Sequence, residues 1–328
     1  MILAVCPNTA IDKIIFIKEW IPGTPMRTNH MVTCVGGKGL NSAVVLRHLG
    51  SETVGMGFFE GKTGKELVEL LEEYGITPEP VWVGGTNRIA HVIAEEKTNI
   101  HSHVITGEVV VSAEQKQEFI TKFRKRVKEA EWVIFAGSLP PTINVDFYFE
   151  LITIAKVAKV PSLIDSQRQY ILEAIKAKPE IVKMNWEEFE WTFNKKAETV
   201  ESLISQAKQL FADEGLINLV MTLGKHGILA FTAEGNFLAK APFQKPVNAA
   251  GAGDAVSSTL AYRLSKGDSW ESALKWSSAV SAATVLTERT GDINMADVER
   301  IYKEVELRKI DTVKNLNRVF KTGAKNEN

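Results

Sequence analysis

Residues 248–264, NAAGAGDAVSSTLAYRL, carry the strongest structural signal in this sequence of 328 residues. Three small residues, Gly251, Ala252 and Gly253, stand directly before Asp254 and a long helical pattern. Where side chains are this small, backbone N–H groups approach an anion closely, and the helix dipole adds partial positive charge at the same place. A carboxylate there would repel a phosphate unless it had a task of its own, such as taking a proton from an attacking hydroxyl. The stretch therefore indicates phosphoryl transfer, although a tight helix–sheet contact with Asp254 in the first helical turn would give the same pattern.

Upstream of this stretch, short apolar runs alternate with amphipathic segments. Strands are predicted at 1–17, 53–58, 132–136, 160–164, 181–184 and 218–222. Helices are predicted at 63–75, from the capping-box pair Ser112 and Gln115 onward, and near 144–158, 168–177, 199–213, 255–265, 269–287 and 295–305. Strands that alternate with helices form βαβ units. The sequence therefore predicts an α/β fold of three layers, with a mainly parallel central sheet and helices on both faces.

Two regions interrupt the alternation of strands and helices. Residues 12–35 and 88–108 contain alternating, β-branched segments without helical spacing between them. We interpret them as a small antiparallel sheet inserted in two pieces, a β lid, set apart from a core of residues 1–11, 36–87 and 109–305. Residues 306–328 are polar and rich in Lys and Asn, and we expect them to form a solvated, partly disordered tail.

A second glycine-rich segment, VGGKGLN at 35–41, also joins a strand to a helical stretch. Gly36 and Gly37 permit the close approach of a ligand, while Lys38 and Asn41 offer a cation and an amide. By itself the segment is more often a simple turn between lid and core with an exposed lysine.

Composition and charge exclude several classes of protein. The chain has 39 Lys and Arg against 40 Asp and Glu, a net charge of -1, whereas proteins that bind nucleic acid or anionic membranes by bulk electrostatics are visibly basic. No apolar run approaches the ~18 residues of a membrane span, and we find no secretory signal pattern. The two cysteines, Cys6 and Cys34, lack the spacing of a disulfide framework or a zinc site, and we expect them to be reduced in a cytoplasmic protein.

Two common nucleotide-binding motifs are incomplete. EGKT at 60–63 is similar to the end of a P-loop, but Met56 stands where that motif needs glycine. Neither GGKGLN nor GAGDAV has the full GxGxxG spacing, which argues against a nicotinamide dehydrogenase.

Taken in order along the chain, the motifs resemble those of the ribokinase-like sugar kinases, also called the phosphofructokinase-B family. Within that family the chain is most similar to the branch of 1-phosphofructokinases and tagatose-6-phosphate kinases, from about residue 2 to 305. The matching segments are PNTAID (7–12), GGKGLN (36–41), GSLPP (137–141), KMNWEEFE (183–190), TLGKHG (222–227) and GAGDA (251–255). The resemblance implies a ribokinase-like fold and an ATP- and Mg²⁺-dependent kinase.

The resemblance also implies a role for each matching residue. The expected sugar pocket consists of Asp12, Gly36, Gly37, Lys38 and Asn41, with Arg88, Ser138 and Arg27 at the phosphate that the substrate already carries. The expected nucleotide site consists of Lys183, Asn185, Glu188, Thr222, Gly224 and Gly227, where Asn185 and Glu188 position Mg²⁺ through water. Asp254 resembles the catalytic base, and the N–H groups of Gly251, Ala252 and Gly253 resemble the anion hole for the γ-phosphate.

Two segments depart from the family pattern. Asn248, Ala249 and Ala250 stand where the family usually carries a hydroxyl beside the nucleotide and a monovalent cation, which leaves a potassium requirement open. In the lid, TNIHSHVITG follows a different pattern from the family's TEIN and PG, with His101 in place of the amide, which leaves the identity of the sugar open.

These observations lead to a functional expectation with two alternatives. We expect phosphorylation of fructose 1-phosphate or tagatose 6-phosphate to the bisphosphate. The alternatives are a kinase for an unphosphorylated sugar or nucleoside, and a catalytically weak regulator that binds sugar phosphate. Because a small lid leaves unpaired strand edges, we also expect a homodimer formed through the lid.

Overall fold

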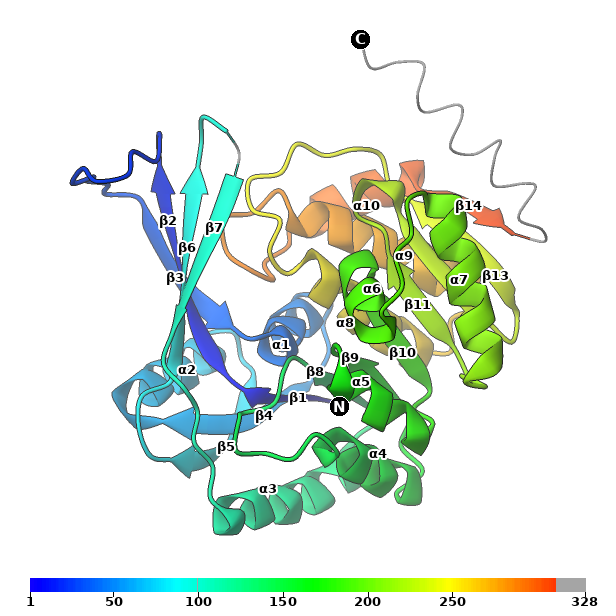
Figure 1. Ribbon diagram of the computed structural model, residues 1–328, viewed down its shortest axis with the longest axis horizontal. Coiled ribbons are helices and arrows are strands. Elements are labelled where there is room, and N and C mark those ends of the chain that lie inside the picture. The colour runs from blue at the N-terminus through cyan, green and yellow to red at the C-terminus, as the bar shows by residue number, and fades with distance from the viewer. Residues whose placement is uncertain (99, 311–328) are drawn as a thin grey trace.

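The computed structural model describes residues 1–98 and 100–310. It contains a ten-stranded sheet with helices on both faces and a separate four-stranded sheet that projects from one end (Figure 1). This arrangement confirms the predicted α/β fold with a lid.

Most of the large sheet is parallel. Its spatial order is β14 (Glu306–Lys309), β13 (Gly235–Lys240), β12 (Ile228–Thr232), β11 (Leu219–Thr222), β10 (Ile181–Asn185), β9 (Ser162–Asp165), β8 (Trp132–Ala136), β1 (Ile2–Asn8), β4 (Thr53–Glu60) and β5 (Thr77–Val83). All pairings from β11 to β5 are parallel, whereas β12, β13 and β14 are added antiparallel. The carboxyl ends of the parallel strands therefore meet at one edge, which is where open α/β sheets bind ligands.

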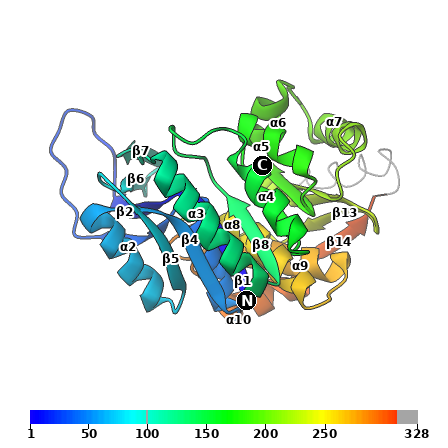
Figure 2. The same ribbon diagram turned by 90° about the horizontal axis from the view of Figure 1, so that it is seen from below.

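Side chains along each buried strand point alternately to the two faces of the sheet, so the core is divided between two layers of helices. In β1, Leu3 and Val5 face one cluster while Ile2 faces another. The first layer contains α3 (Ala113–Arg126), α4 (Phe147–Val157), α5 (Gln169–Ala174), α6 (Trp186–Phe193) and α7 (Val200–Asp213). The second contains α1 (Lys38–His48), α2 (Gly61–Glu73), α8 (Ala252–Ser265), α9 (Trp270–Thr284) and α10 (Met295–Glu304). Figure 2 shows α3 and α4 on one side of the sheet and α9 and α10 on the other.

The lid corrects two details of the prediction. Its strand order is β3 (Met31–Gly36), β2 (Ala10–Ile17), β6 (Arg88–Glu95) and β7 (Ile100–Thr106). The predicted first strand at 1–17 is two strands, since the chain leaves the large sheet at Thr9 and enters the lid at β2. The lid is mixed rather than wholly antiparallel, because β2 and β6 both run outward from the core and pair in parallel. The chain returns through β3 and β7, which pair antiparallel to them.

The start of the predicted tail is also corrected. Residues 306–309 form β14, an edge strand of the large sheet, and Ile310 is buried against the core. The apolar side chains of Leu307 and Ile310 explain this pairing, which the polar composition of the segment obscured. Residues 311–328 lie outside the described part of the chain.

Besides β14, three strands were missed by the sequence prediction. In β5, TPEPVWV, two prolines conceal a strand that lies at the sheet edge, where proline is tolerated. The antiparallel hairpin of β12 and β13 follows the TLGKHG turn.

Within the described residues we find no helix with the length and apolar run that crossing a membrane requires.

Candidate active site

A large cavity lies between the lid and the carboxyl edge of the parallel strands. Its volume is about 1950 Å³. It is lined by residues at the ends of five parallel strands: Asn8 at β1, Ser138 after β8, Ser166 after β9, Asn185 at β10 and Thr222 at β11. Asp12 and Arg88 face it from the lid, and residues 251–254 face it from the start of α8. The fold thus brings together motifs that are more than 200 residues apart in the sequence.

The start of α8 has the backbone geometry that the small residues predict. Gly251 adopts the left-handed conformation, with φ of 83°, and precedes the first helical residue, Ala252. A Cβ atom on Gly253 would lie 2.9 Å from Nζ of Lys183. Gly251, Ala252 and Gly253 all line the cavity. The helix therefore presents free N–H groups and a lysine ammonium to the same space, which suits a phosphate.

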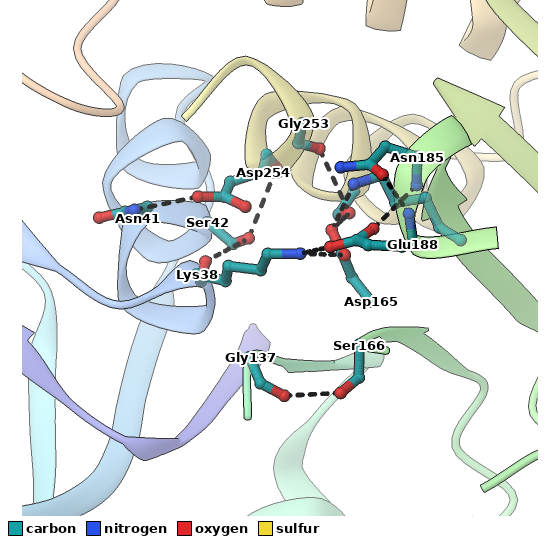
Figure 3. A network of polar contacts seen from close by, with 12 residues as sticks. Lys38, Asn41, Ser42, Gly137, Asp165, Ser166, Asn185, Glu188, Gly253 and Asp254 are labelled. Atoms are coloured by element: carbon teal, nitrogen blue, oxygen red, sulfur yellow. Dashed lines mark hydrogen bonds and ion pairs between the residues drawn. The ribbon is translucent and has the colours of Figure 1, made fainter. Parts of the chain in front are cut away.

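Asp254 is buried in the first turn of α8 and faces α1. Nδ2 of Asn41 donates a hydrogen bond to Oδ2 of Asp254 at 3.0 Å (Figure 3). Burial and the charge of Asp165 raise the pKa of Asp254 to about 6, against the lowering effect of Lys38 and Lys183. A carboxylate with a pKa near 6 is ionised at neutral pH yet is a stronger proton acceptor than an ordinary aspartate, as a general base should be.

A second carboxylate, Asp12, faces the cavity from the lid strand β2. It is 8% exposed, and burial together with the charge of Asp254 raises its pKa to about 7. Gly36 lies directly beside it in β3, where a Cβ atom would collide with the Asp12 carboxylate. Gly36 is therefore required for the position of Asp12 and is not part of the cavity wall.

Four charged side chains form a compact network beneath the helix start. Nζ of Lys38 contacts Oδ1 of Asp165 at 3.2 Å and also forms an ion pair with Glu188 (Figure 3). Nζ of Lys183 contacts Oδ2 of Asp165 at 2.7 Å. Although burial alone would raise the pKa of Asp165, the charges of Lys183 and Lys38 lower it to about 2. Both lysines line the cavity, so the network holds two cations at its wall.

Asp165, the shared partner of Lys38 and Lys183, is one of the residues near the cavity that the sequence reasoning missed. It is fully buried, and Oγ of Ser257 in α8 donates to it at 2.8 Å. It ends β9, and polar residues at the carboxyl ends of parallel strands commonly face the ligand site. That position, directly after the predicted strand 160–164, was the available signal.

Arg88 and Ser138 also line the cavity. Nη1 of Arg88 donates to the backbone oxygen of Asn8 at 3.3 Å, and Nδ2 of Asn8 donates to Oγ of Ser138 at 3.0 Å. Asn8 was not predicted, although it stands within the PNTAID motif. Arg27, by contrast, lies in the exposed connection between β2 and β3, and it does not line the cavity in the described chain.

The predicted nucleotide residues lie along the far wall. Asn185 and Glu188 form a reciprocal capping box at the start of α6, with N–H to oxygen distances of 2.8 and 2.7 Å. Asn185 lines the cavity, whereas Glu188 lies behind it. Thr222, Gly224 and Gly227 also line this wall. At Gly227, with φ of 104°, a Cβ atom would collide with the backbone of Ala239, so only glycine fits the turn.

Comparison with known proteins gives consistent matches over nearly the whole chain. Residues 1–297 match the sequence model of a family described as pfkB family carbohydrate kinase. D-tagatose-1-phosphate kinase of Bacillus licheniformis is 29% identical over 298 residues, which cover 90% of this chain and 96% of that protein. 1-Phosphofructokinase of Bacillus subtilis is 26% identical over 310 residues, 94% of this chain and 100% of that protein. The structure of phosphofructokinase-2 from Escherichia coli in complex with potassium matches with a TM-score of 0.83 and 22% identity, covering 92% of this chain and 98% of that one.

Proposed function

The chain belongs to the pfkB family of carbohydrate kinases, as its motifs predicted, and we propose that it phosphorylates a ketohexose monophosphate with ATP. Relatives named for tagatose 1-phosphate, tagatose 6-phosphate and fructose 1-phosphate support this substrate class. We propose fructose 1-phosphate or tagatose 6-phosphate as the acceptor.

One observation carries the proposal for this chain. The cavity joins an anion-binding helix start and a base to a polar pocket that contains Arg88. Within the described residues, the buried Oδ1 atoms of Asn8 and Asn41 accept no hydrogen bond, and both residues line this pocket. Unpaired buried acceptors are costly, which favours a ligand rich in hydroxyl groups.

In the proposed reaction, the acceptor hydroxyl lies beside Asp254 and the γ-phosphate of ATP lies at residues 251–253. The hydroxyl oxygen forms a bond to the γ-phosphorus, the bond from phosphorus to the bridging oxygen of ADP breaks, and the proton passes to Asp254. The N–H groups of α8, with Lys183 and Lys38, stabilise the negative charge of the transferred group. Closure of the lid over the sugar would exclude water.

Magnesium is expected to arrive with the nucleotide. Both carboxylate oxygens of Glu188 already contact protein groups, Lys38 and the backbone N–H of Asn185, so direct coordination of a metal is not favoured. Within residues 1–98 and 100–310 there is no cluster of three or more His, Cys, Asp or Glu suited to a metal. Mg²⁺ commonly keeps several waters. Asn185, which lines the cavity, would bind those waters, and Glu188 would hold Asn185 in place from behind. When bound, the ion neutralises charge on the phosphates.

A coupled assay of ADP release across a panel of sugars tests the proposed function. We expect turnover with fructose 1-phosphate or tagatose 6-phosphate and little with free fructose, ribose or nucleosides. Turnover of unphosphorylated acceptors alone would refute the substrate class, and tight binding of a sugar phosphate without turnover would indicate a regulator.

Replacement of Arg88 should act mainly on substrate binding. A charged hydrogen bond to a phosphate is worth about 1.5–3 kcal/mol, so Arg88→Ala should raise KM for the sugar phosphate roughly 10–100-fold with a smaller change in kcat. The exposed Arg124 of α3 provides a matched control, since Arg124→Ala removes the same charge far from the cavity. Equal KM values for wild type and Arg88→Ala would remove Arg88 from the phosphate site.

The lid motivates a proposal about assembly. Its edge strand β7 exposes Ile100, Val104 and Ile105, and its outer backbone edge has no strand partner among residues 1–98 and 100–310. Exposed apolar edge strands tend to pair with another chain. We propose a homodimer through the lid, for which light scattering should give twice the mass of the chain; a monomeric mass across the concentrations used for the assay would refute it.

A further inference from the structure

Two loops frame the start of α8. The first, residues 241–251, connects β13 to α8, and the second, residues 285–294, connects α9 to α10. The backbone N–H groups of Val247 and Asn248 both donate to the backbone oxygen of Val285, at 2.7 and 3.2 Å. The loops are therefore joined by direct hydrogen bonds next to the proposed γ-phosphate site.

The side chain of Asn248 completes this connection. It is 1% exposed, and its Nδ2 donates to the backbone oxygen of Glu288 at 3.0 Å. Its Oδ1 accepts from the backbone N–H of Ala250 at 3.0 Å. One buried amide thus holds the second loop with one end and the residue before Gly251 with the other.

Gly251 and Ala252, at the proposed anion hole, also contact the second loop and α9. A Cβ atom on Gly251 would lie 3.0 Å from the backbone nitrogen of Gly291 and 3.0 Å from Cγ2 of Thr290, so the two loops touch here as well. Oγ of Ser281 in α9 donates to the backbone oxygen of Ala252 at 2.9 Å. The direction of the N–H groups therefore depends on how the second loop is held.

The contacts that join these loops occupy oxygen atoms that a monovalent cation would need as ligands. Potassium is bound by several oxygen atoms, most often backbone carbonyls. Here the carbonyls of Val285 and Glu288 accept N–H groups, and Asn248, Ala249 and Ala250 supply neither hydroxyl nor carboxylate. We infer that the Asn248 amide replaces a monovalent cation in joining the two loops, so that this kinase needs no potassium. The inference rests on the proposed kinase function and adds to it the regulation of the same site by ions.

Asn248→Asp tests the inference with almost no change of shape. The substitution replaces the donor Nδ2 by an oxygen, which then faces the Glu288 carbonyl. Two facing acceptors repel each other, and a cation between them would relieve the repulsion. We therefore expect wild-type kcat to change less than about twofold between KCl, NaCl and choline chloride at equal ionic strength. In choline chloride the kcat of Asn248→Asp should be roughly 10–100-fold below that of the wild type, the usual scale for an unpaired buried group. In KCl this kcat should recover at least in part.

Asn218→Asp is the matched control. Asn218 is 4% exposed, and its Nδ2 also donates to a backbone carbonyl, that of Glu180, at 2.9 Å, but it lies away from the cavity. The new charge should lower the stability of the Asn218→Asp variant, but its kcat should not depend on potassium.

Melting temperatures in the same salts, with and without a non-hydrolysable ATP analogue, give a readout that does not require the sugar to be known. They also separate this inference from the proposed function, which the sugar assay tests. Several-fold activation of the wild type by KCl would overturn the inference, whatever Asn248→Asp does. Asn248→Asp that folds and equals the wild type in every salt would overturn it too.

Discussion

Asp254→Asn is expected to lower kcat by roughly 10²–10⁴-fold, the usual contribution of a general base. The neutral amide keeps the shape of the side chain and can still accept the hydrogen bond from Asn41, so the first turn of α8 should be retained. Only the capacity to take the proton of the acceptor hydroxyl is lost. A kcat within about tenfold of the wild type would show that another group is the base.

The same substitution should stabilise the protein at neutral pH. The folded state raises the pKa of Asp254 from 3.8 to about 6, so the protonated form is favoured in the fold and the ionised form is costly. Stability is therefore lost as pH rises through about 4 to 6, and the full cost remains above that range. Asp254→Asn should melt a few degrees higher than the wild type at pH 8, and the difference should shrink near pH 4. A lower melting temperature at pH 8 would mean that the ionised carboxylate contributes to stability.

The dependence of kcat/KM on pH follows from the same carboxylate. Since the base must be ionised, kcat/KM should fall as pH decreases below about 6, the pKa of Asp254. Asp254 also helps to raise the pKa of Asp12 to about 7. The fall of kcat/KM at low pH therefore reports the coupled titration of both carboxylates.

Local motifs predicted those parts of the site that consist of residues adjacent in the sequence. The helix start at 251–254 is predictable because small residues, a carboxylate and a helical pattern follow one another directly. Arg88 and Asp12 required the resemblance to a family, because a single charged residue in a strand carries no signal of its own. These segments lie around one cavity because of the order of the strands in the sheet, and no pattern of neighbouring residues contains that order.

The roles of Asp165 and Asn248 could not be predicted from neighbouring residues, for a related physical reason. Each acts through contacts with residues far away in the sequence: Asp165 with Lys38 and Ser257, and Asn248 with Glu288. Their roles are visible only when these partners are placed. The role of Arg27 at the substrate phosphate stays a prediction, and in the described chain Arg27 does not line the cavity.

Asp165→Asn is expected to damage both stability and turnover. The carboxylate is fully buried between Lys183, which is 2% exposed, and Lys38. Removing one partner of a buried ion pair leaves an uncompensated charge and typically costs about 3–5 kcal/mol of unfolding free energy. Both lysines line the cavity beside the helix start, so their displacement should also lower kcat, by roughly 10²-fold or more if about 2.7 kcal/mol of transition-state stabilisation is lost.

The pH profile separates an electrostatic role of Asp165 from simple loss of folding. The charge of Asp165 raises the pKa of Asp254, whereas Lys38 and Lys183 lower it. Asp165→Asn removes the raising contribution and leaves the two lysines, so the acid limb of kcat/KM should move to lower pH. A variant that was only partly unfolded would lose amplitude without moving the limb.

Asp165→Asn/Lys183→Met completes the test. Removing both charges of the buried pair should restore most of the lost stability, since replacing such a pair by apolar groups is often neutral. Lys38 keeps its partner Glu188 in this double variant. Turnover should nevertheless remain low, because the ammonium of Lys183 lies beside Gly253 and the proposed γ-phosphate site. If the double variant recovered kcat together with stability, the network would serve folding alone, and the positive charge at the anion hole would come from the N–H groups of α8 and Lys38.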